Sequence, residues 1–314
     1  MILLAGFVLK GVLQAALVIS AMAMLGLLVA PVGWLSSAAV VLVTLVNGYR
    51  QGLVTMAAAF AGSLLFAMII FAGTGETAAD FPALAFELVA YIALLIWLPA
   101  WIVAAALQIT VSLKLTLQLL TGICLLAVAV FYLLFPDFGE IWRGYFDQVI
   151  AELAGQTDAE TLAAIQSMED GLIRFLPGLF VSSLMFGTLV SLFLGRWWQA
   201  VYFNPGGFAQ EFQSLALGKT MSLVALAIVA LSLVLHSFVM YAFMTVVMLL
   251  YLVQGLAILH AVFRIKAMHV AWLVLVYGLM LFIPQVMMLV VFVGLADSWI
   301  DVRQRLAGAD GRRS

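Results

Sequence analysis

Charged residues are scarce in this chain. Only 9% of its 314 residues are charged, whereas 67% are hydrophobic, and the mean hydropathy is +1.24. A water-soluble domain carries about 25% charged residues, most of them on its surface. The composition therefore excludes a soluble globular domain and predicts a protein that uses lipid as part of its solvent.

Cysteine, excess basic charge and catalytic motifs are also missing. Cys124 is the only cysteine, which excludes an intrachain disulfide and a cysteine metal cluster. The net charge of -2 offers no basic surface for nucleic acid. The chain has no His-Glu-x-x-His zinc motif and no Gly-x-Ser-x-Gly elbow. The phosphate-loop ending Gly218-Lys219-Thr220 is incomplete, because Gln213 stands where that loop needs a glycine. We therefore expect no enzyme, no cofactor and no metal site.

Long apolar runs fill most of the chain instead. A helix needs about 20 apolar residues to cross a bilayer. The candidate spans are 11–31, 34–48, 52–73, 82–107, 110–135, 171–195, 219–236, 238–262 and 268–296. Pro31-Val32-Gly33-Trp34 predicts a turn between the first two runs. Polar residues around His236 and Ser237 predict a second break, and Pro284-Gln285 predicts a bend in the last run.

The remaining charges are sorted by sign. The longest polar segment, 137–170, holds eight acidic residues and one basic residue, Arg143. Basic residues gather in other connections and at the end of the chain. The positive-inside rule therefore places the basic segments in the cytoplasm and the acidic segment outside. Nine crossings would leave the basic end outside, so we expect about eight spans (seven to nine) with both termini in the cytoplasm.

Residues 137–170 predict an outer amphipathic helical hairpin. Apolar residues recur at helical spacing from Trp142 to Leu153, and Gly155 ends that helix. Thr157 and Glu160 form a capping box that starts the next helix. Two interpretations remain open: a lid over a ligand cavity, or an interfacial helix pair that shields the bundle.

Residues 196–218 form a second polar segment, the elbow, which the charge pattern places in the cytoplasm. Asn204-Pro205-Gly206-Gly207-Phe208 predicts a turn, because proline lacks a donor and glycine frees the backbone. A short surface helix is expected to follow. The elbow is either a connector at the lipid headgroups or a docking and gating element, whose candidate residues are Asn204, Gly206 and Gly207.

Residues 297–314 form the tail. A carboxylate cannot stay unpaired in hydrocarbon, so we expect Asp297 to cap a short cytoplasmic helix that runs to Arg305. Asp301 and Arg305 allow an i,i+4 ion pair. This helix either anchors the chain or docks a partner, with Asp297, Asp301 and Arg305 as the candidate residues.

Uncharged polar side chains within the apolar runs are the candidate ligand-binding groups. An amide in a membrane helix either bonds to a neighbouring helix, which contributes about 1 kcal/mol, or lines a cavity. The candidates are Gln14, Gln118, Gln254 and Gln285.

Three parts of the chain carry a resemblance to a known family. These are Gly11-Val12-Leu13-Gln14-Ala15, the elbow from Arg196-Trp197-Trp198-Gln199-Ala200 to Phe208, and the ending from Gly294 to Arg305. Together they resemble the YybS-like family of bacterial inner-membrane proteins, over nearly the whole chain. That family has no settled biochemical function. Its membrane core is thought to be similar to the substrate-binding subunits of energy-coupling-factor vitamin transporters, which implies a transport-related role without assigning binding residues. Those small subunits generally lack an outer acidic hairpin.

The sequence thus predicts an all-α, polytopic transmembrane helical bundle made of one domain, residues 1–314. The expected function is non-catalytic: binding, or helping to transport, a small or lipidic ligand. The alternative is a membrane scaffold that acts through helix–helix contacts. Membrane lipid is the expected partner. A protein partner or a second copy of the chain is left open, and nucleic acid is not expected.

Overall fold

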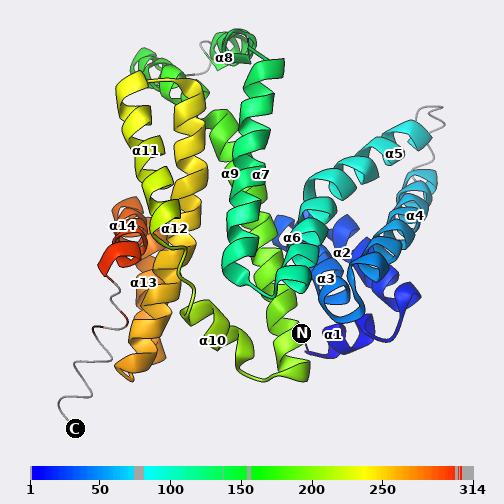
Figure 1. Ribbon diagram of the computed structural model, residues 1–314. Coiled ribbons are helices and arrows are strands. Elements are labelled where there is room, and N and C mark those ends of the chain that lie inside the picture. Colours follow the sequence, from blue (N-terminus) through cyan, green and yellow to red (C-terminus); the bar gives the residue numbers. More distant parts are fainter. Residues whose placement is uncertain are drawn as a thin grey trace. The chain divides into compact units, whose positions relative to one another are not determined.

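Every described element of the protein is a helix (Figure 1), which confirms the all-α class. The computed structural model describes residues 2–73, 81–136, 138–153 and 157–300, together with Arg303 and Arg305. The helices are α1 (Ile2–Val8), α2 (Val12–Leu28), α3 (Ala30–Asn47), α4 (Tyr49–Gly73), α5 (Phe81–Ile92), the π-helical turn η1 (Ala93–Trp97), α6 (Leu98–Thr110), α7 (Leu113–Leu134), α8 (Phe138–Leu153), α9 (Ala159–Phe203), α10 (Gly207–Gln213), α11 (Lys219–Leu235), α12 (Phe238–Ile265), α13 (Val270–Phe282) and α14 (Pro284–Ile300).

The helices identify a multi-pass membrane protein. Six helices in the described ranges are long and apolar enough to cross a membrane, or up to seven if the bent pair of α13 and α14 is one span. All nine apolar runs predicted above are helical. The expected count of eight spans is not confirmed, because α2 and α11 have only 17 residues each. Such a helix is about 25 Å long, shorter than a hydrocarbon core of about 30 Å.

The chain divides into two compact units. The first comprises Met1–Leu119 and Leu184–Ser214, and the second comprises Leu120–Ser183 and Leu215–Ser314. The boundaries fall inside α7 and α9, so each of these helices contributes to both units. The single domain that we expected is therefore built from two units, which are described separately below.

Interhelical hydrogen bonds hold the core of the first unit together. The Ser20 hydroxyl on α2 donates to the carbonyl of Ala59 on α4 at 2.8 Å. The Ser36 hydroxyl on α3 donates to the Ile19 carbonyl at 2.8 Å. The indole of Trp97, in η1, donates to the Ser36 hydroxyl at 2.9 Å. These buried bonds satisfy polar groups that would otherwise be costly in a low-dielectric interior.

The first expected turn lies earlier than predicted. α2 ends at Leu28, Val29 is extended, and α3 begins at Ala30. Pro31 and Trp34 therefore belong to the start of α3 and not to the turn. Proline is tolerated in the first helical turn, because its missing N–H would have no intrahelical partner there.

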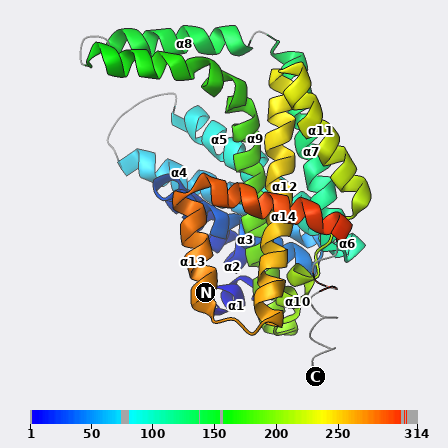
Figure 2. The ribbon, with the colours of Figure 1, turned by 90° about the vertical axis from the view of Figure 1, so that its left-hand side faces the viewer.

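The two breaks predicted in the second half of the chain are confirmed. α11 ends at Leu235, and His236 adopts a left-handed backbone with φ of 48° before α12 begins. α13 ends at Phe282, and α14 starts at Pro284 after a bend of 116°. Figure 2 shows α14 running across α12 in the second unit.

The amphipathic hairpin predicted for residues 137–170 is also present. α8 lies beside the first part of α9 (Figure 2), and Arg143 and Glu169 approach each other to 3.9 Å across the pair. α9, which has 45 residues in all, then continues into an apolar span, with Pro177 inside the helix. Gly155, expected to end the first helix, lies outside the described residues.

The residue that caps α9 differs from the one predicted. The Asp158 carboxylate, and not the Thr157 side chain, accepts hydrogen bonds from the Thr161 backbone N–H at 2.8 Å and from the Thr161 hydroxyl at 2.9 Å. These bonds lower the pKa of Asp158. The capping box was assigned one residue too early, because threonine and aspartate are both common N-cap residues.

Candidate functional site

A partly enclosed polar cavity lies beneath the start of α8 in the second unit. Its volume is about 360 Å³. The walls come from the end of α7, the first turns of α8, α9 near Ile173 and the break between α11 and α12. Its polar side chains are Tyr132, Glu140, Arg143 and Ser237. The cavity therefore combines a carboxylate, a guanidinium and two hydroxyl groups.

One of these groups lacks a partner. The Tyr132 hydroxyl is buried and forms no hydrogen bond with any described residue. Leaving a buried hydroxyl unsatisfied costs about 1–3 kcal/mol. Glu140 and Arg143 are three residues apart on α8, so their side chains lie on the same side of the helix. The Tyr132 hydroxyl has almost no accessible surface, so Arg143 is the group that could pair with a polar ligand in this cavity.

A second, apolar cavity adjoins the polar one. Its volume is about 220 Å³, and its walls have no polar surface. Phe138 lines both cavities. Its ring meets that of Phe131 edge-on at 5.1 Å and stacks on Trp142 at 5.9 Å. A polar space and an apolar space thus meet at one aromatic ring.

A proline in α9 joins the walls of the two cavities. Pro177 lines the apolar cavity, and Ile173, four residues earlier, lines the polar one. Proline has no N–H, so the Ile173 carbonyl cannot receive the helical hydrogen bond that a residue at 177 would otherwise donate. The helix therefore lacks one backbone hydrogen bond in the turn that contributes Ile173 and Pro177 to the two cavities.

A second polar feature, the Gln254 cluster, lies where α14 crosses α12. It comprises Gln254, Asp297, Ser298 and Arg303. The Gln254 amide donates to the Gly294 carbonyl at 2.7 Å and to the Ser298 hydroxyl at 3.3 Å. Its oxygen accepts from the Leu217 backbone N–H at 3.0 Å. Gln254, predicted as a ligand-binding residue, thus ties α12 to α14 and to the connection before α11.

Asp297 belongs to the same cluster. Its carboxylate is 2.8 Å from the Arg303 guanidinium, and only 2% of its side chain is exposed. Arg303 also donates to the Leu215 carbonyl at 2.9 Å. The prediction that Asp297 caps a new helix is wrong, because α14 continues from Pro284 to Ile300 and the carboxylate is neutralised within the second unit. Asp301 lies outside the described residues, and Arg305 is exposed.

The four predicted glutamines are divided between the two units. Gln14 and Gln118 belong to the first unit, on α2 and α7. Gln285 is exposed at the start of α14, about 14 Å along the helix from the residues that contact Gln254. Of the four, Gln254 alone is fully buried in the described structure. The position of a glutamine within an apolar run did not predict whether its side chain would be buried.

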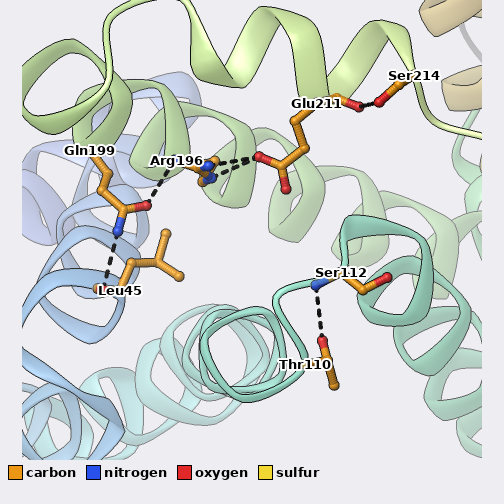
Figure 3. A network of polar contacts seen from close by, with 7 residues as sticks. All are labelled: Leu45, Thr110, Ser112, Arg196, Gln199, Glu211 and Ser214. Atoms are coloured by element: carbon orange, nitrogen blue, oxygen red, sulfur yellow. Dashed lines mark hydrogen bonds and ion pairs between the residues drawn. The ribbon is translucent and has the colours of Figure 1, made fainter.

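The elbow forms as predicted in the first unit. Asn204 is exposed, Gly206 has a left-handed backbone with φ of 85°, and α10 follows from Gly207. Arg196 Nε donates to the Glu211 carboxylate at 2.9 Å (Figure 3), which attaches α10 to α9. This ion pair is partly buried, so it is screened less than a surface pair.

Gln199 continues this network towards α3. Its amide oxygen accepts from Arg196 at 3.0 Å, and its amide nitrogen donates to the Leu45 carbonyl at 3.2 Å (Figure 3). Side-chain hydrogen bonds and an ion pair therefore hold the elbow in place, and its turn at Asn204 is exposed. No partner is needed to explain its conformation.

The cavity residues were not identified from the sequence. The amphipathic pattern of α8 indicated a lid over a cavity, but Tyr132 lies on α7 and Ser237 lies at the break before α12, and the signal at Ser237 indicated only that break. Glu140 and Arg143 had one available signal, their spacing of three residues on a predicted helix.

No family model, no curated protein and no solved structure matches this chain. The resemblance to the YybS-like family therefore stays a prediction.

Proposed function

We propose that this membrane protein binds an amphipathic, lipid-like ligand beneath the α8–α9 hairpin. The observation that carries the proposal is the pair of adjoining cavities, one polar and one apolar, that share Phe138. A lipid has the same division into a headgroup and an acyl chain. The proposal corresponds to the first of the two interpretations of the hairpin given above, in which the hairpin is a lid over a ligand cavity.

Each cavity would hold one part of the ligand. The polar part would lie near Arg143. The apolar part would lie against Phe131, Trp142 and the α9 helix at Pro177. Each CH₂ group that moves from water into such a cavity contributes about 0.8 kcal/mol. Transport of the ligand, with or without a partner protein, would use this bound state as its starting point.

Filling the apolar cavity is expected to abolish binding. Val181 lines that cavity, so Val181→Trp would occupy the space of the acyl chain. Leu179→Trp is the matched control, because Leu179 is 51% exposed on the same helix and does not line the cavity. The measurement is native mass spectrometry of delipidated protein incubated with phosphatidylglycerol or phosphatidylethanolamine. Equal lipid retention by both variants would contradict the proposal.

We also propose that the protein lies in a bacterial inner membrane with both termini in the cytoplasm and the hairpin outside. The sign of the charges supports this orientation. Gln166→Cys on α9 and Gln210→Cys on α10 place single thiols at exposed positions once Cys124 is replaced by alanine. An impermeant thiol reagent applied to intact cells is expected to label Gln166→Cys only. Labelling of Gln210→Cys alone would reverse the orientation.

The alternative function, a membrane scaffold, has less support. Scaffolds of this kind associate through small residues that allow close helix contact. Gly255 and Gly294, the closest such contact between α12 and α14, face each other within the chain. They are therefore used for internal packing and not for a partner helix.

A further inference from the structure

The polar cavity beneath the hairpin lies at the level expected for lipid headgroups. Two apolar spans have their ends beside it, because α7 ends at Leu134 and α12 begins at Phe238. The apolar cavity reaches further along α7, since Val128 precedes the end of that helix by six residues, about 9 Å along its axis. A phospholipid with its headgroup in the polar cavity and an acyl chain in the apolar one would therefore keep its ordinary orientation in a bilayer.

The charged groups of the polar cavity are of both signs. Glu140 and Arg143, three residues apart on α8, both line it. Arg143 approaches Glu169 of α9 to 3.9 Å. Among the described residues, Glu140 forms no hydrogen bond or ion pair, not even with Arg143. The cavity therefore presents a carboxylate whose negative charge a ligand could neutralise.

Arg143 can bind a ligand while it keeps its contact with Glu169. A guanidinium group has five N–H donors, arranged so that several acceptors can share it. The contact with Glu169 is made through Nε, and half of the Arg143 side chain is exposed. Phosphate oxygens accept strong, charge-assisted hydrogen bonds from arginine. Arg143 therefore suits the phosphate of a headgroup.

The first turn of α12 adds to the positive side of the cavity. Ser237, Phe238 and Val239 line the cavity, and they are the N-cap and the first two residues of this 28-residue helix. The N-terminus of a long helix carries a partial positive charge from its aligned peptide dipoles. The Ser237 side chain forms no capping hydrogen bond. A phosphate near Arg143 would thus also be favoured by this helix end.

We propose that the polar cavity selects a zwitterionic phospholipid headgroup, with its phosphate at Arg143 and its ammonium group at Glu140. The inference rests on the proposed lipid binding and names the headgroup that the same site prefers. Phosphatidylethanolamine carries both charges, whereas phosphatidylglycerol carries only the negative one. Phosphatidylglycerol would leave Glu140 without a counter-charge and would bring a second negative charge close to it, which disfavours the anionic lipid.

The test is native mass spectrometry of the delipidated chain in an equimolar mixture of phosphatidylethanolamine and phosphatidylglycerol with identical acyl chains. Wild type is expected to retain phosphatidylethanolamine about fivefold over phosphatidylglycerol, the upper end of the effect of one partly exposed ion pair. Glu140→Gln keeps the shape of the side chain without its charge and should bring the ratio close to one. Glu140→Lys should reverse the preference. Glu152→Gln is the matched control, because Glu152 is exposed on α8 and does not line the cavity.

Val181→Trp distinguishes a failure of this inference from a failure of the proposed function. Lipid retention that Val181→Trp removes, but that is equal for the two lipids in wild type, would overturn the headgroup preference alone. No retention by wild type, or retention unchanged by Val181→Trp, would overturn both. A preference that persists in Glu140→Gln and Glu140→Lys would overturn the role of Glu140. The wild-type ratio tests the preference even if a Glu140 variant does not accumulate.

Discussion

Replacing Gly294 by alanine is expected to cost the second unit about 3 kcal/mol of unfolding free energy, the upper part of the usual range for overpacking. An added Cβ would overlap the Tyr251 carbonyl and approach the Gly255 nitrogen to 2.7 Å. Both are backbone atoms, which cannot move aside as a flexible side chain can. The expected measurement is a lower unfolding midpoint in detergent, because α14 must move away from α12.

Gly278→Ala is the matched control for this prediction. Gly278 lies in α13, and nothing stands within 4 Å of the position that its Cβ would take. Alanine favours the helix over glycine by about 1 kcal/mol, so this variant should be neutral or more stable. If the two variants shift the midpoint in the same direction, the close crossing of α12 and α14 is not present in the protein.

Removing the carboxylate of Asp297 is expected to destabilise the chain by about 3–5 kcal/mol, the usual cost of breaking a buried ion pair. Asp297→Leu removes the carboxylate that pairs with Arg303, whose side chain is only 15% exposed. Arg303→Met in the same chain removes the guanidinium as well. The double variant should therefore recover much of the lost stability, measured by unfolding in detergent.

Comparing the single and double variants distinguishes loss of the ion pair from loss of side-chain packing. The losses of unfolding free energy caused by Asp297→Leu and Arg303→Met are expected to be strongly coupled, since substitutions of residues in direct contact do not have additive effects. Additive losses would mean that the two side chains act independently, and the cluster would then not hold α14 in place.

The breaks between helices could be predicted because they depend on local chemistry. Pro284 cannot donate to the helical turn before it, and Pro205 is followed by Gly206 with a left-handed backbone, so each position favours the end of the preceding helix. The break at His236 and Ser237 was also visible as polar residues inside a long apolar run. Helix ends were less certain: Pro31 suggested a turn but lies inside α3, where proline is equally acceptable.

The span count and the site depend on tertiary structure. Hydropathy does not distinguish a straight span from a bent helix pair, because both expose apolar residues; the 116° bend between α13 and α14 is a property of the folded chain. The ion pair of Asp297 with Arg303 was not predicted, because Arg303 lies beyond the end of α14 and a spacing of six residues does not match one face of a helix. Tyr132 and Ser237 meet in the polar cavity from helices more than 100 residues apart in the sequence. The hydrophobic periodicity of the sequence does not predict that these two residues lie near each other.

Ligand binding beneath the hairpin is tested most directly by photo-cross-linking. The purified, delipidated chain is incubated with a substoichiometric phospholipid that carries a diazirine in its acyl chain, irradiated and mapped by peptide mass spectrometry. The account predicts cross-links on the walls of the apolar cavity, at Val128, Phe131, Leu176, Pro177, Phe180 and Val181, and not at Leu179. Excess unlabelled phospholipid and Val181→Trp should both remove these cross-links. Cross-links spread evenly over the lipid-facing helices, α13 included, and unchanged by competitor or by Val181→Trp, would contradict the proposed function.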